Sequence, residues 1–183
     1  CATDNLRDLR DRAILMVAFA SGGRRRSKIA GLRVEQLSVE APISVTNGPP
    51  LPSLTIHLGR TKTTSGEQDD VVYLTGRPVE ALQTWMAAAK IDRRSVFRGI
   101  GRWGTISERA LDPQSVNAVL KQRAELAGLE PAEFSAHGLR SGYLTEAANR
   151  PPLPEAMEQS RHRSVQQASS YYNSATRRSG RAA

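Results

Sequence analysis

The chain has 183 residues, of which 39% are apolar and 24% are charged, so its composition is that of an ordinary globular domain. Its longest apolar runs fall far short of the roughly 20 residues that a membrane-spanning helix needs, and its single cysteine, Cys1, excludes internal disulfides and multi-cysteine zinc sites. We therefore expect a cytoplasmic protein without a membrane partner. The formal charge of +8 favours a polyanion such as nucleic acid as partner, although a basic surface that only serves solubility would carry the same charge.

The N-terminal part predicts two helices separated by a glycine turn. Apolar residues recur at three- and four-residue steps over residues 6–20, which predicts a helix with one face in the core. Gly22 and Gly23 interrupt this pattern, and residues 24–32 predict a short second helix that opens with three arginines. We therefore expect an arginine cluster at the N-terminus of a helix.

The next part predicts a small antiparallel sheet. Residues 43–45, 54–58 and 71–74 are short, β-prone runs that are bounded by proline, glycine and aspartate. The connection between the second and third strands, residues 59–70, is polar and contains Gly66, which is typical of a long exposed hairpin loop.

Three further helices are predicted before the C-terminal part. Pro78 marks the start of the first of them, because a proline in the first turn loses no hydrogen bond. Asp112 and Pro113 form the N-cap and first position of the next, which Gly128 ends. The last is expected from about residue 135 to residue 149.

The C-terminal part predicts two shorter helical pieces. Three prolines between residues 151 and 154 interrupt the chain before residues 155–159, and residues 164–167 match a capping box that begins the last helix. Residues 177–183 are expected to be a disordered tail. The complete pattern predicts an α+β fold, mainly α-helical with a small three-stranded antiparallel sheet, in one domain over residues 1–176. Because the chain begins at Cys1 and not at a methionine, we expect a fragment of a longer protein.

Two spaced pairs of polar residues are candidates for one site. His137 and Arg140, three residues apart in a predicted helix, would project from the same face and could contact one phosphate, although surface pairs often have this spacing. His162 and Tyr171 would lie on opposite faces of an unbroken helix, because nine residues rotate by about 900°. The capping box removes this obstacle, since His162 then precedes the helix. Taken alone, Tyr171 and its neighbour Tyr172 are equally typical of packing residues.

In this order, the motifs resemble those of the tyrosine recombinase, or phage integrase, family, and the resemblance extends from about residue 4 to residue 173. The first arginine of the family lies in a Gly-x-Arg-x-Ser pattern after a core helix, which the residues from Gly23 to Ser27 match. The family lysine lies in a hairpin, commonly within Thr-Lys-Thr, and a His-x-x-Arg motif follows later. The catalytic residues that the resemblance implies are Arg25, Lys62, His137, Arg140, His162 and the nucleophile Tyr171.

Two positions depart from the family pattern. Lys28 stands where the family usually has a carboxylate, and Arg161 replaces a glycine that often precedes the second histidine. A carboxylate would neutralise and orient the neighbouring arginines, whereas a fourth cation adds repulsion near the expected phosphate site. Lys28 therefore indicates reduced activity, and it favours an alternative in which the chain is a DNA-binding module of the same fold with impaired catalysis.

The resemblance implies the tyrosine recombinase catalytic-domain fold and a site-specific recombinase or integrase that rejoins DNA through a 3′-phosphotyrosyl intermediate. Arg25 and Arg140 would clamp the phosphate, His162 would add a hydrogen bond, and His137 and Lys62 would act as base and acid. Such chemistry uses no metal or other cofactor. The implied partners are double-stranded DNA and other protomers in a tetrameric synapse, in a bacterium, phage or mobile element. A type IB topoisomerase-like strand transferase is a further alternative.

The family usually carries a separate N-terminal helical domain that grips the other side of the DNA, and no segment of this sequence corresponds to it. We therefore expect the chain alone to bind DNA weakly, with steep salt dependence.

Overall fold

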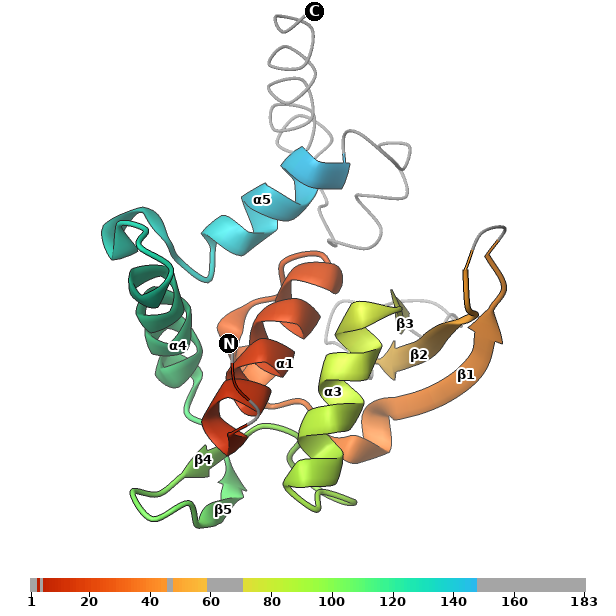
Figure 1. Cartoon of the computed structure of the whole chain (residues 1–183), viewed down its shortest axis with the longest axis horizontal. Helices are drawn as coiled ribbons and strands as arrows, with labels where there is room; N and C mark the ends of the chain where they lie inside the picture. Colours follow the sequence, from red (N-terminus) through yellow and green to blue (C-terminus); the bar gives the residue numbers. More distant parts are fainter. Residues whose placement is uncertain (1–2, 4, 46–47, 59–70, 148–183) are drawn as a thin grey trace, which may run out of the picture.

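The computed structural model describes residues 3, 5–45, 48–58 and 71–147, and Figure 1 shows the order and arrangement of their elements. The helices and strands are α1 (Leu6–Ala20), α2 (Arg26–Ala30), the 3-10 helix η1 (Val34–Gln36), β1 (Leu37–Ile43), β2 (Leu51–His57), β3 (Val71–Thr75), α3 (Arg77–Ala88), β4 (Arg98–Ile100), β5 (Ile106–Ala110), α4 (Pro113–Leu126), the 3-10 helix η2 (Pro131–Glu133) and α5 (Gly138–Ala147).

Helix α1 lies in the middle of the molecule, with α3 along one side and α4 along the other, and α5 crosses its C-terminal end (Figure 1). It begins where the Asn5 side chain accepts a hydrogen bond from the Asp8 N–H at 2.9 Å, which satisfies one free amide of the first turn. On its inner face Ala13, Ile14 and Val17 are fully buried, and Leu6, Met16 and Ala20 pack partly buried against the core. The helix predicted over residues 6–20 is therefore confirmed.

The core is built from side chains of the helices, of the three-stranded sheet and of the segment before β4. Burying such large apolar groups removes them from water, and each stabilises the fold by about 1.5–3 kcal/mol. The largest fully buried side chains are Trp85, Phe97, Ile14, Ile29, Ile56, Leu74, Leu82 and Leu144.

The three-stranded antiparallel sheet has the order β1-β2-β3, and α3 packs against it. Leu54 of the central strand pairs with Val39 on one side and with Leu74 on the other. The prediction of three antiparallel strands is confirmed, but the first strand was placed wrongly at residues 43–45. It is β1, an exposed edge strand that contains Glu40 and Pro42 and that shows none of the alternation by which half-buried strands are recognised.

A second, two-stranded sheet was not predicted. Strands β4 and β5 form a hairpin, which the fully buried Val96 and Phe97 connect to the core. The indole N–H of Trp85 in α3 donates to the Val96 carbonyl at 2.9 Å. The base of the hairpin is therefore held by packing and by a buried hydrogen bond.

Helices α3 and α4 begin as predicted. Pro78 lies in the first turn of α3, and the Asp112 carboxylate caps α4 by accepting from the Gln114 N–H at 2.7 Å. After α4, Gly128 has a left-handed φ of +74°, which suits its predicted role at the helix end. Leu126, the last residue of α4, is 69% exposed.

A buried ion network joins α1 to α4. The Arg123 guanidinium lies 2.7 Å from an Asp8 oxygen and 2.6 Å from an Asp11 oxygen, and Arg10 pairs with the other Asp11 oxygen at 2.7 Å. The Asp11 side chain is only 2% exposed. Removing one partner of such a buried pair leaves an uncompensated charge, so this network fixes the position of α4 against α1.

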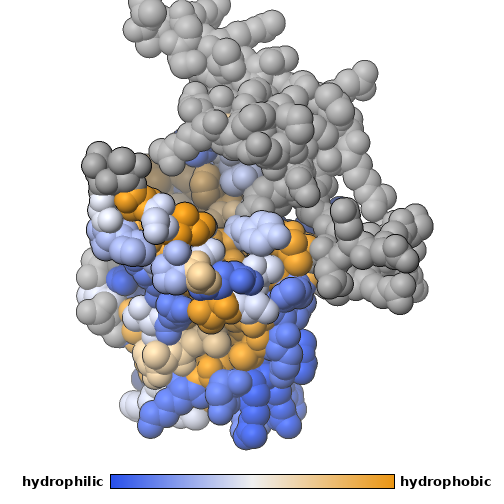
Figure 2. All heavy atoms as spheres, turned by 90° about the vertical axis from the view of Figure 1, so that its right-hand side faces the viewer, coloured by the Kyte–Doolittle hydropathy of each residue, from blue (hydrophilic) through white to orange (hydrophobic). Residues whose placement is uncertain are grey.

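The surface combines polar and apolar side chains. Large exposed apolar side chains on the sheet include Val39 and Tyr73, and the face seen in Figure 2 is a mixture of hydrophobic and hydrophilic groups. Within the described part of the chain, no helix is long and apolar enough to cross a membrane. The helices predicted at residues 155–159 and after Ser164, and the tail at residues 177–183, lie outside the described residues.

Candidate active site

The turn between α1 and α2 leads to the first predicted catalytic arginine, Arg25. Gly22 and Gly23 both have left-handed φ angles, +81° and +65°, and the amide N–H groups of both donate to the Phe19 carbonyl. The chain is thereby reversed, and Arg25 becomes the N-cap residue of α2. The predicted helix over residues 24–32 is confirmed in a shorter form, with the arginine cluster at its N-terminus.

The three neighbouring arginines have different surroundings. Arg24 has its Nε and one terminal nitrogen out of contact with solvent, and Arg26 donates to the Gln114 side chain of α4 at 3.0 Å. The Arg25 side chain is exposed. Arg25 and Arg26 are thus both exposed, and of the two it is Arg25 whose charge acts on Arg140 of α5.

Arg140, in the first turn of α5, lies close to Arg25. Burial lowers the pKa of the Arg140 guanidinium, and the positive charge of Arg25 lowers it further. Since arginine stays protonated in proteins, the exposed Arg25 and the half-buried Arg140 concentrate two positive charges at one place. An anion bound between them would relieve the repulsion, and two guanidinium forks can each donate twice to phosphate oxygens.

Direct backbone packing holds the two arginines together. A Cβ atom on Gly23 would overlap the backbone N and Cα atoms of Arg140 and lie 2.8 Å from its Cβ. Only a residue without a side chain allows the turn to approach α5 this closely. Gly23 therefore has two reasons to be glycine, its left-handed φ and the lack of space.

The start of α5 is fixed by hydrogen bonds from the preceding loop. The Ser135 hydroxyl accepts from the Gly138 N–H at 3.0 Å, and the Asn117 side chain of α4 accepts from the Ala136 N–H at 3.0 Å. The helix begins at Gly138 and not near residue 135, so the prediction that His137 lies within it was wrong. The His137 side chain is exposed just before the helix, and its carbonyl accepts from the Arg140 N–H at 3.1 Å.

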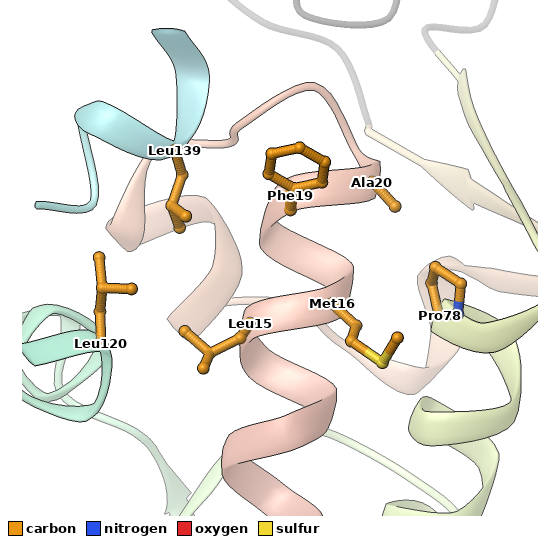
Figure 3. Close-up of a pocket in the computed structure, with 7 residues that line it drawn as sticks. All are labelled: Leu15, Met16, Phe19, Ala20, Pro78, Leu120 and Leu139. Carbon is orange, nitrogen blue, oxygen red and sulfur yellow. The ribbon is translucent and has the colours of Figure 1, made fainter. Parts of the chain in front are cut away.

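Helix α5 lies on α1 through aromatic and aliphatic contacts. The rings of Phe19 and Tyr143 meet edge to face, with centroids 5.9 Å apart, and burial raises the pKa of the Tyr143 phenol. Leu139 and Phe19 line an open apolar hollow of about 370 Å³ (Figure 3), together with side chains of α3 and α4. The packing of Leu139 and of Tyr143, which lie on either side of Arg140 in the sequence, therefore fixes the position of Arg140.

Three of the predicted site residues, Lys62, His162 and Tyr171, lie outside the described residues. The segment that contains Lys62 leaves β2 and returns in β3, and the flanking residues His57 and Val71 are paired across these strands. Both ends of this segment therefore lie at the same end of the sheet. Of the predicted residues that the structure describes, it brings Arg25 and Arg140 together and places His137 at the start of the same helix.

Sequence reasoning missed the residues that position this site. Gly23 was recognised as a helix break and as the start of the Gly-x-Arg-x-Ser motif, but its contact with Arg140 was missed because the two residues are more than a hundred positions apart. Ser135 was taken as a helix residue, although a serine three residues before an amide is also the pattern of a helix cap. Asn117 gave no local signal.

Comparison with known proteins agrees with these motifs. The model of the phage integrase family matches residues 1–178. The chain belongs to the phage integrase family. It is 32% identical over 165 residues to an integrase/recombinase xerD homolog of Selenomonas ruminantium, in an alignment that covers 88% of the chain and 46% of that relative. This phage integrase family member thus spans about half the length of the curated relative that it matches.

Solved structures share the fold. A XerH site-specific recombinase bound to its palindromic difH substrate, in a post-cleavage complex, superposes with a TM-score of 0.67 at 19% identity, over 100% of this chain and 47% of the other. A XerA recombinase superposes with a TM-score of 0.57 at 16% identity, over 94% of this chain and 60% of the other. At such identities the likeness shows the fold alone, which confirms the predicted catalytic-domain fold of this phage integrase family member.

Proposed function

We propose that this chain is the catalytic domain, over residues 1–176, of a site-specific recombinase that breaks and rejoins DNA through a covalent bond to Tyr171. The observation that carries the proposal is the Arg25 and Arg140 pair, in which the close contact of Gly23 with Arg140 brings the half-buried Arg140 near the exposed Arg25. Such a pair suits a phosphodiester, whose non-bridging oxygens gain negative charge as a nucleophile attacks. Membership of the phage integrase family supports the same reading.

In the proposed first step, the Tyr171 oxygen attacks the phosphorus and the bond from phosphorus to the 5′ oxygen breaks. His137 takes the tyrosine proton, and Lys62 gives a proton to the departing 5′ oxygen. Arg25, Arg140 and His162 donate hydrogen bonds to the non-bridging oxygens. A 5′ hydroxyl of another strand then attacks the 3′-phosphotyrosyl bond and releases Tyr171, so that the energy of the bond is conserved.

The proposed partners are double-stranded DNA and three further protomers in a tetrameric synapse. The XerH structures are complexes with DNA substrate, and the charge of +8 on this chain suits the same class of partner. We place this activity in the cytoplasm, at the DNA of a bacterium or of a mobile element that it carries.

A second candidate is a DNA-binding module of the same fold with impaired catalysis. It is favoured by Lys28, an exposed cation on α2 three residues after Arg25, at a position where a carboxylate would neutralise the arginines.

Covalent capture on a nicked suicide duplex separates the two candidates. Loss of a short 5′-hydroxyl strand after cleavage prevents rejoining, so an active recombinase accumulates a protein–DNA adduct that survives denaturing gels. We expect this adduct without added metal or ATP, also in the presence of a chelator. DNA binding without any adduct, by the full-length protein on its own recombination site, would leave only the second candidate.

A further inference from the structure

The tip of the β4–β5 hairpin carries the most exposed aromatic side chain of the described residues. Trp103 is 87% exposed, and its ring lies under the Arg102 guanidinium, with the carbon of that group 5.2 Å from the ring centroid. A tryptophan buries a large apolar area when it finds a partner, and tryptophan and arginine are both enriched where proteins bind other molecules.

Hydrogen bonds and buried residues hold the hairpin backbone that carries Trp103. The Gly101 N–H donates to the Thr105 carbonyl at 2.8 Å across the turn, and Gly104 has the left-handed φ of +82° that the turn requires. Below it, Phe97 is fully buried and Arg98 donates to the Ser95 and Arg93 carbonyls. The backbone that carries the exposed ring is therefore hydrogen-bonded at the turn and anchored at the base of the hairpin, which favours a preorganised contact.

The charge around the tip is positive. Residues 92–110 contain five arginines against two carboxylates, a net charge of +3, and no carboxylate lies between residues 99 and 107. One of the two acids, Glu108, pairs with Arg94. In addition, the Arg7 guanidinium of α1 donates to the Gly101 carbonyl at 3.0 Å, which places another cation at the turn. A tryptophan among arginines suits a polyanion that also offers apolar sugar and base edges, as duplex DNA does, better than it suits an apolar protein surface.

We propose that this tip, formed by Arg102, Trp103 and Arg7, is a second contact with duplex DNA, remote from the strand-cleaving site. Arg7 lies in the first turn of α1, and the Gly23 turn that holds Arg140 follows its last turn, so the two contacts lie at opposite ends of this helix (Figure 1). A helix of 15 residues is about 22 Å long, which corresponds to about six or seven base pairs at 3.4 Å each. The arginines would bind phosphates there, and the indole would pack against sugar or base edges in the groove. This inference rests on the proposed function in one respect, namely that the bound polyanion is double-stranded DNA.

Equilibrium binding tests the contact without any chemistry. The chain with Tyr171→Phe would be titrated with a fluorescent duplex of about 30 base pairs over a series of low salt concentrations. We expect Trp103→Ala to weaken binding about tenfold. Arg102→Gln should reduce the slope of log K against log salt by about one, the value for one lost phosphate contact.

Matched variants provide the controls. Leu126→Ala removes another strongly exposed apolar side chain, and Lys121→Gln removes another exposed charge, on α4. The two hairpin variants and the two control variants should all keep the thermal unfolding midpoint of the parent, because each substituted side chain is at the surface. Affinity and salt slope that stay at the parent values in both hairpin variants would overturn the proposal.

Photocrosslinking identifies the partner directly. A benzoylphenylalanine at position 103 should attach to the DNA strand on irradiation. Attachment to a second copy of the chain, in place of DNA, would show a protein interface and would also overturn the proposal. Since neither measurement requires cleavage, a protein that forms no covalent adduct but crosslinks to DNA at position 103 would refute the proposed function and leave this contact in place.

Discussion

The backbone of Arg140 lies directly against Gly23, with no room for even one additional carbon atom between them. This contact joins the turn after the central helix to the first turn of α5, and it brings the charge of Arg25 close enough to lower the pKa of Arg140. The geometry of the proposed phosphate clamp therefore depends on a residue without a side chain.

Gly23→Ala should destabilise the protein and abolish the adduct. The left-handed φ costs an alanine about 1 kcal/mol, and the overlap with Arg140 adds about 1–3 kcal/mol or displaces α5. We expect a loss of about 2–4 kcal/mol in the free energy of unfolding, measured by urea denaturation. Gly128→Ala is the matched control, because Gly128 also has a positive φ but has open space around it. Equal losses in the two variants would contradict the packing explanation.

Arg25→Ala should reduce the rate of adduct formation about 100- to 1,000-fold, the usual effect of removing one donor to a developing charge. Arg26→Ala should keep a rate close to that of the parent, because Arg26 is engaged with Gln114 at the surface. Single-turnover kinetics on the suicide duplex measure both. A larger loss in Arg26→Ala than in Arg25→Ala would transfer the proposed role to the neighbouring residue.

Tyr171→Phe should abolish the covalent adduct, while Tyr172→Phe should retain it. The two side chains would point about 100° apart on the predicted helix, so only one can reach the phosphate. Denaturing gels and mass spectrometry of the trapped peptide give the answer. An adduct on Tyr172 would show that the spacing from His162 was read one residue too short.

Lys28→Glu should accelerate adduct formation. A carboxylate at this exposed position of α2 would reduce the repulsion among the arginines, and an exposed charge interaction of up to about 1 kcal/mol corresponds to about a two- to fivefold change in rate. The same suicide duplex measures it, with Lys121→Glu as the control for a general change in charge. A slower reaction of Lys28→Glu would indicate that this lysine itself assists DNA binding.

Arg123→Ala should lower the free energy of unfolding by about 1–3 kcal/mol, because Asp8 and Asp11 lose their common partner while Asp11 keeps its pair with Arg10. Glu108→Gln breaks only the exposed pair with Arg94 and should cost less than about 1 kcal/mol. Chemical denaturation at neutral pH compares the two. Similar small losses would mean that the buried network is dispensable.

The stability of the same network should fall in acid. Hydrogen bonds from the Thr3 hydroxyl, from its N–H and from Arg123 lower the pKa of Asp8 from 3.8 to about 2. A depressed carboxyl pKa stabilises the folded state above the unfolded value, so this contribution is complete above about pH 4 and is lost as the pH falls towards 2. Thermal unfolding of Asp8→Asn should therefore show a flatter decline over this range. An unchanged acid decline would assign it to other carboxyl groups.

Local sequence signals predicted the elements whose start or periodicity is encoded nearby. The apolar period of residues 6–20, Pro78, and the Asp112–Pro113 cap each fix a helix through neighbouring residues, and all three are confirmed. The β1 strand and the β4–β5 hairpin escaped because none of their strands alternates buried and exposed residues. Strand β1 is an exposed edge, and β4 has only three residues.

The family motifs predicted which residues belong to the candidate site, but the sequence did not predict how these residues lie relative to one another. The resemblance to a family selected Arg25 and Arg140, and the structure places them together. The start of α5, however, depends on how Ser135 and Asn117 bond the loop before it, and Asn117 lies in another helix. Lys62, His162 and Tyr171 stay predictions.

The length of α1 is constrained by what lies at its two ends. Arg7 contacts the hairpin turn at one end, and the Gly23 turn contacts α5 just beyond the other. An insertion of one residue within α1 would lengthen the helix by about 1.5 Å and rotate one end against the other by about 100°, so at least one contact would be lost. An insertion of about seven residues, or two full turns, would nearly restore the rotation. It would, however, lengthen the helix by about 10 Å. The length of α1 thus sets the spacing between these two contacts. We expect insertions and deletions within α1 to disrupt the fold even where single substitutions on its surface are harmless.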